Sequence, residues 1–177
     1  MTQYRRHIVA GGTYFFTVNL ADRSSRLLIE QIALLRRAVT ETRQEHPFDI
    51  DAIVILPDHL HAIWTLPAGD ADFPARWRKI KARFSRLLPE RKVVSGSLRQ
   101  KNEKGIWQRR FWEHAIRNPS DLRNHIDYIH YNPVKHGHCR CVSDWPYSSF
   151  HRYCASGIYP ADWGGCAVRK FPGAYGE

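Results

Sequence analysis

Two histidines with the spacing of a metal-ligand pair, His59 and His61, flank Leu60 in an apolar segment. Successive side chains on a strand alternate between its faces, so the two imidazoles should point the same way and Leu60 into the core. Neighbouring imidazoles on a sheet can hold a metal ion and leave coordination positions open for substrate oxygens. A bare His-x-His pair is more often two histidines on a half-solvated strand, so the rest of the chain must decide.

A second reactive group lies in the segment 125–133. Tyr128 and Asn132 are i, i+4 neighbours that share a helix face, and His125 lies one turn earlier on that face. A phenol beside an amide could supply a nucleophile and a third metal ligand to the histidine pair. A free tyrosine has a pKa of about 10 and needs help from a metal or a base to attack. Tyr131 is a rival nucleophile, but it leaves Asn132 on a wrongly facing position.

The elements that must position these residues can be read from hydrophobic periodicity and turn residues. We expect strands over 12–20, 51–56, 59–66 and 111–116, and helices over 27–46, 73–88 and 119 to about 131. Asn118 should cap the last helix and Pro133 should end it. This order predicts an α+β fold of the ferredoxin-like βαββαβ type, an antiparallel sheet with helices on one face, followed by a C-terminal catalytic helix. We expect one domain over 1–177, with a core of about 10–135 and an irregular tail of about 137–177.

The charge balance indicates a polyanionic partner. Lys and Arg number 27 against 17 Asp and Glu, a formal net charge of +10. The basic side of the 73–88 helix carries Arg76, Arg78, Lys79, Lys81, Arg83 and Arg86. The residues that we predict to contact DNA are Arg5, Arg6, Arg78, Lys79, Lys81, Arg83, Arg109, Arg110 and Lys135. Guanidinium groups interleaved with aromatic residues, as in 107–112, suit single-stranded nucleic acid. No apolar run reaches the ~20 residues of a membrane span, so we expect no membrane contact and a cytoplasmic, nucleoid-associated protein.

Six stretches of the chain together carry a family resemblance. They are 4–6 (YRR), 11–19 (GGTYFFTVN), 56–64 (LPDHLHAIW), 107–114 (WQRRFWEH), 128–137 (YIHYNPVKHG) and 144–150 (DWPYSSF). In this order they resemble the REP-associated tyrosine transposases, single-tyrosine members of the His-hydrophobic-His (HUH) transposases. The resemblance covers the chain up to about Tyr153.

The resemblance implies an enzyme that cuts single-stranded DNA beside short REP-type palindromic hairpins. Tyr128 would attack the phosphodiester, hold the 5′ phosphate covalently and leave a free 3′-OH that can later rejoin strands. His59, His61 and Asn132 would hold a divalent ion, Mg²⁺ or Mn²⁺, although related single-tyrosine enzymes place glutamine where Asn132 stands. Related transposases often work as dimers in which the helix and the histidine pair come from different subunits. The longer tail of this chain could instead let one subunit complete its own site, so we favour a monomer with its active site in cis over a dimer.

Two other interpretations stay open at this level. The chain could be a catalytically silent module that binds hairpin DNA or RNA on the same fold, since a fold alone does not establish an activity. It could also be a structural zinc protein that uses the segment 136–141 (HGHCRC), although this spacing is not that of zinc ribbons or fingers. The joint presence of His59, His61, Tyr128 and Asn132 favours the enzyme.

Overall fold

A four-stranded antiparallel sheet forms the centre of the computed structural model, which describes residues 8–89 and 105–165. Its strands are β1 (Thr13–Asn19), β2 (Asp49–Ile55), β3 (His59–Thr65) and β4 (Trp112–Ala115), in the spatial order β2-β3-β1-β4. Between β1 and β2 lie α1 (Leu27–Glu30) and α2 (Ile32–Glu45), and between β3 and β4 lies α3 (Phe73–Leu87). The chain continues through α5 (Pro119–Lys135), η1 (Val142–Asp144) and α6 (Phe150–Ala155). The ferredoxin-like plan expected from the sequence is confirmed.

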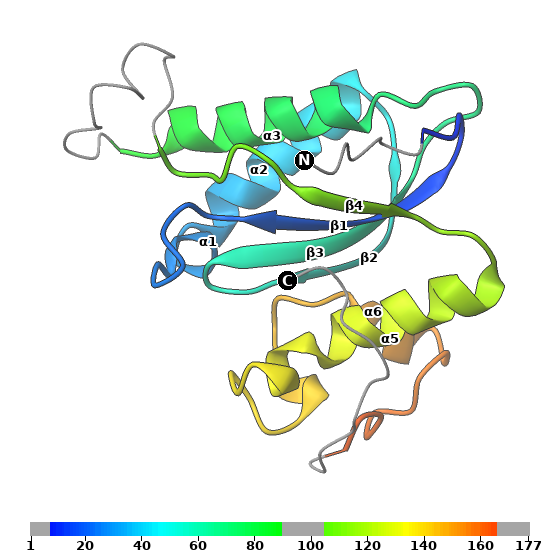
Figure 1. The fold of residues 1–177 in the computed structure, drawn as a ribbon. Helices are drawn as coiled ribbons and strands as arrows, with labels where there is room; N and C mark the ends of the chain where they lie inside the picture. Colours follow the sequence, from blue (N-terminus) through cyan, green and yellow to red (C-terminus); the bar gives the residue numbers. More distant parts are fainter. Residues whose placement is uncertain (1–7, 90–104, 166–177) are drawn as a thin grey trace, which may run out of the picture.

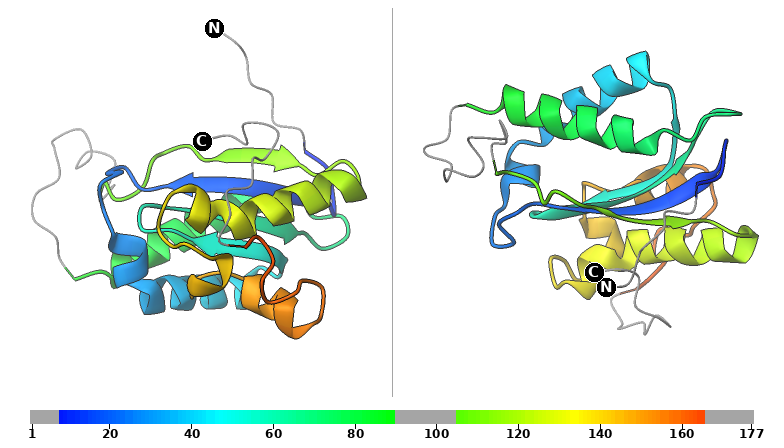
Figure 2. Two further views of the ribbon diagram at one scale, coloured as in Figure 1. Left: turned by 90° about the horizontal axis from the view of Figure 1, so that it is seen from below. Right: turned by 45° about the horizontal axis from the view of Figure 1, so that its top comes forward.

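Helices cover both faces of this sheet. Figure 1 shows α2 and α3 above the sheet and α5 and α6 below it. The right view of Figure 2 keeps α3 and α5 on opposite sides of the sheet, and the left view shows α5 in front of the strands. Alternate side chains of β1 point to opposite faces of the sheet. Phe16 belongs to the core under α2 and α3, whereas Phe15 packs with Ile126 and Ile129 of α5. In the first core the indoles of Trp64 and Trp77 stack with ring centroids 4.1 Å apart. The sheet therefore separates the layer of α2 and α3 from the layer that carries Tyr128.

Two predicted helix boundaries were wrong. The helix expected over 27–46 is divided at Gln31, whose φ of −113° and ψ of 33° leave the helical region. The helix expected to stop before Pro133 instead runs through it to Lys135. Just after the helix, the chain turns at Gly137, where φ is +70° and where the amides of Gly137 and His138 donate to the carbonyls of Val134 and Pro133. This is the Schellman pattern, so the stop comes from the glycine and not from the proline.

The C-terminal segment docks against the outer strand β2 and the end of α5. The Ser149 amide donates to the Ile53 carbonyl, and the Trp145 indole donates to the Ile55 carbonyl. Tyr131 packs there against Val142 and Phe150. Over residues 137–165 the predicted tail is thus irregular, with η1 and α6 as its regular elements. Within residues 8–89 and 105–165, no helix is both long and apolar enough to cross a membrane.

Candidate active site

The imidazoles of His59 and His61 lie next to each other on the sheet face that α5 covers. Their ring centroids are 5.0 Å apart, and both side chains are buried. Leu60 faces the opposite way, into the core under α2 and α3, as strand alternation predicted. Among the described residues, neither Nε2 atom has a hydrogen-bond partner, although both are buried. Buried, unpaired ring nitrogens are costly unless they serve a ligand, which makes this pair a candidate metal centre.

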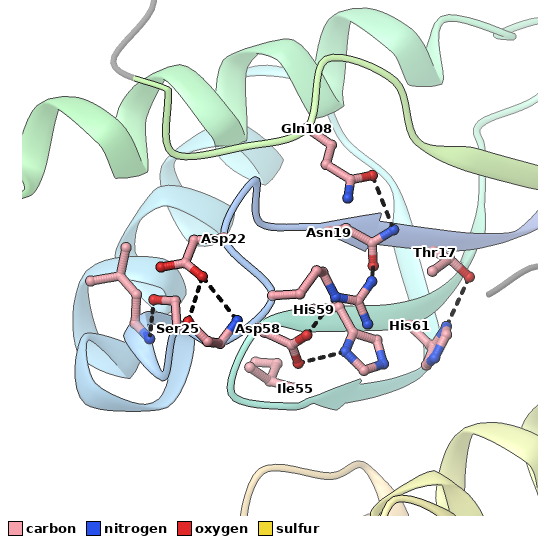
Figure 3. A network of polar contacts seen from close by, with 12 residues as sticks. Thr17, Asn19, Asp22, Ser25, Ile55, Asp58, His59, His61 and Gln108 are labelled. Atoms are coloured by element: carbon pink, nitrogen blue, oxygen red, sulfur yellow. Dashed lines mark hydrogen bonds and ion pairs between the residues drawn. The ribbon is translucent and has the colours of Figure 1, made fainter. Parts of the chain in front are cut away.

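Each histidine is oriented through its other ring nitrogen. Strand pairing sets Thr17 of β1 opposite His61, and Thr17 Oγ1 lies 2.9 Å from His61 Nδ1. Asp58 Oδ1 lies 2.8 Å from His59 Nδ1, and Arg23 donates to the other Asp58 oxygen at 2.6 Å. Figure 3 shows these contacts, with both rings on the side of the sheet that faces α5. Because Nδ1 of each ring is engaged, Nε2 is the nitrogen left to bind a ligand. Metal-binding histidines usually have their other ring nitrogen hydrogen-bonded in this way.

Burial also sets the protonation state of the pair. Burial lowers the pKa of His61 well below its usual value of 6.5, and the neighbouring His59 and His136 lower it further. Burial lowers the pKa of His59 as well, against the opposing effect of Asp58. Both rings are therefore neutral near pH 7, and the neutral imidazole is the form that binds a metal ion.

Tyr128 reaches this pair from α5. Its ring centroid lies 5.3 Å from that of His61 and 6.0 Å from that of Phe15, and its side chain is buried. One turn later Asn132 is fully buried, and among the described residues neither its amide oxygen nor its amide nitrogen has a partner. The rival Tyr131 instead packs against Val142 and Phe150. One helix thus places a phenol against His61 and, four residues later, carries a buried amide whose polar atoms have no partner among the described residues.

Comparison with known proteins bears on this arrangement. No protein-family model matches the chain. A REP-associated tyrosine transposase of Escherichia coli (strain K12) is 52% identical over 165 residues, which cover 93% of this chain and 92% of that protein. The chain belongs to the family of REP-associated tyrosine transposases. The resemblance inferred from the motifs is confirmed, and this REP-associated tyrosine transposase is accordingly an enzyme.

Two further comparisons extend over nearly the whole transposase chain. A relative from Haemophilus influenzae, named for the same family, is 49% identical over 98% of this chain and 99% of its own length. A solved structure of a REP-associated tyrosine transposase bound to a REP hairpin is 51% identical, with a TM-score of 0.83. That alignment covers 100% of this chain and 98% of the other. The fold of this chain is therefore the fold of a family member.

The side chains predicted to contact DNA fall into three groups. Arg5 and Arg6 lie outside the described residues. Arg78, Lys79, Lys81 and Arg83 are on α3, across the sheet from Tyr128. Arg109 and Arg110 are exposed beside β4, and Lys135 ends α5 near Tyr128. Among the described members of this set, Lys135 is the one that contacts the tyrosine, and the DNA contacts of the whole set stay predictions.

Several of the α3 cations already have protein partners. Lys79 and Arg83 both pair with Glu45 of α2, and Lys81 Nζ donates to the Gln108 carbonyl at 2.8 Å. Burial lowers the pKa of Lys81 to about 8. Arg76, assigned from the helical pattern to the basic side, is buried and bonded to Asp70. That assignment was wrong, because charge spacing does not distinguish a solvated guanidinium from one that fastens a loop.

A cluster that the sequence analysis did not recognise joins β4 to the start of α5. His114 Nε2 lies 2.9 Å from Asp121 Oδ2, and His125 Nδ1 lies 3.1 Å from Asp121 Oδ1. The three side chains could hold a metal ion by donor type. Their donor atoms are, however, engaged with one another, and the Arg117 amide also donates to Asp121 at 2.9 Å. We interpret the cluster as a hydrogen-bonded clamp that seats the tyrosine helix on the sheet.

The structure does not support a structural zinc site in the segment 136–141. Burial raises the pKa of the Cys139 thiol to about 11, which keeps it protonated. Cys141 is disulfide-bonded. The disulfide deprives the segment of the Cys141 thiolate that a structural zinc ion would need.

The orienting residues Thr17, Asp58 and Arg23 were not assigned from the sequence. Asp58 precedes His59, so a nearby carboxylate was visible, but nothing local showed which atom it would meet. Thr17 lies 44 positions from His61, and only the register of β1 against β3 brings them together. A histidine pair on a predicted strand is therefore a reason to search the neighbouring strand for hydroxyl or carboxylate partners.

Proposed function

We propose that this transposase cleaves and rejoins single-stranded DNA at REP-type palindromic hairpins through a covalent 5′-phosphotyrosine on Tyr128. The observation that carries the proposal is the contact of the Tyr128 ring with His61, beside two buried, neutral imidazoles whose Nε2 atoms are unpaired among the described residues. The solved relative bound to a REP hairpin supports the choice of substrate. Such an enzyme would work in the cytoplasm, at the nucleoid.

The residues present fit a divalent metal ion. His59 and His61 offer ring nitrogens and Asn132 offers an amide oxygen, and the Nδ1 contacts with Asp58 and Thr17 would hold the two rings in place. We propose these three as the ligands, with Mg²⁺ or Mn²⁺ as the ion. When bound, the ion would polarise a phosphate oxygen and align the scissile bond.

The chain's own groups account for the bond exchange. A bond forms between Tyr128 Oη and phosphorus, the bond from phosphorus to the 3′ oxygen breaks, and the phenolic proton is balanced by the proton that the released 3′-OH takes up. Rejoining reverses these changes, with a 3′-OH as the nucleophile and the phenol as the leaving group. The energy of the phosphodiester bond is kept in the phosphotyrosine bond, so the exchange needs no nucleoside triphosphate.

An end-label experiment tests the proposal. Oligonucleotides carrying palindromic hairpins from the genome that encodes the chain are incubated with the protein and Mg²⁺ or Mn²⁺, then separated on a denaturing gel. With wild type, the 3′-end label should shift with the protein and the shift should disappear on protease treatment, whereas the 5′-end label should leave as a shorter free strand. Tyr128→Phe should form no adduct, and Tyr131→Phe should form as much as wild type.

Binding measurements separate the enzyme from the silent binding module. Fluorescence anisotropy should show that Tyr128→Phe binds the hairpin as wild type does, since only a hydroxyl is removed. Hairpin binding by wild type without adduct or cleavage in either metal would contradict the proposal and favour the binding module. An adduct that persists in Tyr128→Phe would assign the nucleophile elsewhere.

A further inference from the structure

Lys135 places an ammonium group at the phenol of Tyr128. Lys135 Nζ lies 3.5 Å from Tyr128 Oη and 5.0 Å from the centre of its ring. The two residues are seven positions apart on α5, which is two helical turns on one face. Helical side chains lean towards the N-terminus, so a lysine in the last turn reaches back along the helix to the tyrosine. Lys135 is exposed whereas Tyr128 is buried, so the ammonium lies on the solvent side of the phenol.

The other described groups near this contact face the tyrosine ring or lie beyond the groups that face it. His61 faces the tyrosine ring from β3, and Phe15 faces it from β1. Beyond His61, as counted from the tyrosine, lies His59. The rings of His59 and His136 meet edge to face, with centroids 5.3 Å apart. Arg23 lies beyond His59 and is engaged by Asp58. Lys135 thus brings a cation from the same helix directly to the phenolic oxygen.

We propose that Lys135 is a catalytic residue that stabilises the negative charge on Tyr128 Oη during cleavage and rejoining. The inference rests on the proposed function and extends it. Negative charge develops on this oxygen as it attacks phosphorus, and again as it leaves when a 3′-OH displaces it. A fixed donor aimed at an oxygen where charge develops lowers the barrier in both directions. The bonds made and broken are those given above, and none of them involves Lys135.

This role differs from the one expected from the sequence, which was contact with a DNA phosphate. A lysine that only binds the backbone contributes to affinity and to its salt dependence. A lysine at the nucleophile changes the rate within the bound complex. The two roles therefore separate when binding and single-turnover chemistry are measured independently.

Lys135→Met tests the proposal, because methionine keeps an unbranched chain and removes the charge. With full-length protein, saturating hairpin oligonucleotide and Mg²⁺ or Mn²⁺, the single-turnover rate of adduct formation should fall about 100-fold, the effect typical of losing one such donor. Lys135→Arg should recover about one tenth of the wild-type rate or more. Arg36→Met, which removes a cation from the exposed side of α2, is the matched control and should react as wild type.

The same substitution in a Tyr128→Phe background gives the affinity without chemistry. We expect Lys135→Met to change the dissociation constant there by less than about threefold, well below the loss in rate. A normal saturated rate with weakened, less salt-dependent binding would overturn the proposal and restore the phosphate-contact role. Rejoining is a second measurement: purified adduct mixed with excess 3′-OH strand should release its DNA more slowly when Lys135 is replaced. Absence of any wild-type adduct would instead mark failure of the proposed function itself.

Discussion

At the scale of single residues, the candidate active site depends on groups that touch neither DNA nor the reacting atoms. Thr17 and Asp58 each occupy the Nδ1 atom of one histidine, at 2.9 and 2.8 Å. Arg23 in turn joins Asp58 to Asn19, whose Oδ1 it contacts at 2.7 Å. Figure 3 shows this chain of contacts reaching Gln108 beyond Asn19. These groups determine which ring nitrogen each histidine presents, and so prepare the site before any ligand arrives.

Thr17→Val should weaken metal binding while preserving the strand. Valine keeps the β-branched shape that suits a strand but cannot hydrogen-bond His61 Nδ1. Loss of such an orienting partner typically lowers metal affinity about 10- to 100-fold. Mn²⁺ binding followed by electron paramagnetic resonance would measure the change. Thr13→Val is the control, because Thr13 lies on the same strand but bonds Thr65. Equal Mn²⁺ affinity in the two variants would contradict the orienting role of Thr17.

At the scale of elements, α5 is the part on which the site depends. Its start is held by Asn118, whose side chain accepts from the Asp121 amide at 2.9 Å, and by the clamp of Asp121 with His114 and His125. Its end is closed by the Schellman turn at Gly137. Apolar residues seat its middle against β1 and β2. Tyr128 is thus placed by a helix fixed at both ends.

Asn118→Ala should reduce the free energy of unfolding by about 1 kcal/mol, the usual cost of losing an N-cap. The reason is that the Asp121 amide would lose its side-chain acceptor. Urea denaturation of the variant and wild type would measure the difference. Ser120→Ala, at an exposed position of the same first turn, should lie within about 0.5 kcal/mol of wild type. Equal stabilities of Asn118→Ala and Ser120→Ala would show that the cap does not hold α5.

His130 gives the packing of α5 against the C-terminal segment a pH dependence. It is fully buried, with Nε2 2.8 Å from Ser149 Oγ, and burial lowers its pKa from 6.5 to about 3. As the pH falls below 6.5, His130 becomes protonated in the unfolded chain, whereas in the folded protein it stays neutral until about pH 3. The free energy of unfolding therefore decreases as the pH falls through this window.

His130→Gln should remove that part of the pH dependence, because glutamine is neutral in both states. Between pH 7 and pH 5, wild type should lose roughly 2 kcal/mol more of its unfolding free energy than the variant does. Urea titrations at the two pH values measure both quantities and cancel the contributions of the other histidines. The difference in unfolding free energy between wild type and variant should therefore change between pH 7 and pH 5. If it stayed the same, His130 would be protonated as readily in the folded protein as in the unfolded chain.

At the scale of the whole molecule, one chain supplies all parts of the candidate site. β1 and β3 give Thr17, His59 and His61, and α5 of the same chain places the Tyr128 ring 5.3 Å from that of His61. Because the tyrosine meets the histidine pair within one chain, we propose a monomer that completes its active site in cis.

A mixing experiment tests the monomer. Tyr128→Phe and His61→Ala are each inactive by expectation, and an equimolar mixture should stay inactive because no chain has both residues. Light scattering should give the mass of one chain. If two subunits shared each site, the mixture would regain part of the activity, and the adduct would form on the His61→Ala chain, which retains its tyrosine. Recovered activity would therefore contradict the cis site.

The sequence by itself determined the parts that depend on local periodicity. Strand alternation placed His59 and His61 opposite Leu60, turn residues delimited the four strands, and Asn118 before Pro119 marked the start of α5. The i, i+4 spacing put Tyr128 and Asn132 on one helix face. These features follow from backbone geometry within a few residues, so a single chain without coordinates reveals them.

Only the tertiary structure decided which distant groups meet. The register of β1 on β3 pairs Thr17 with His61, and the sheet sends α5 to the face opposite α2 and α3. The same packing buries Arg76 on Asp70, and it turns the end of α5 so that Lys135 reaches Tyr128. Local patterns set the faces of each element, but contacts between elements depend on register, crossing and side-chain reach, which are settled only when the whole core packs.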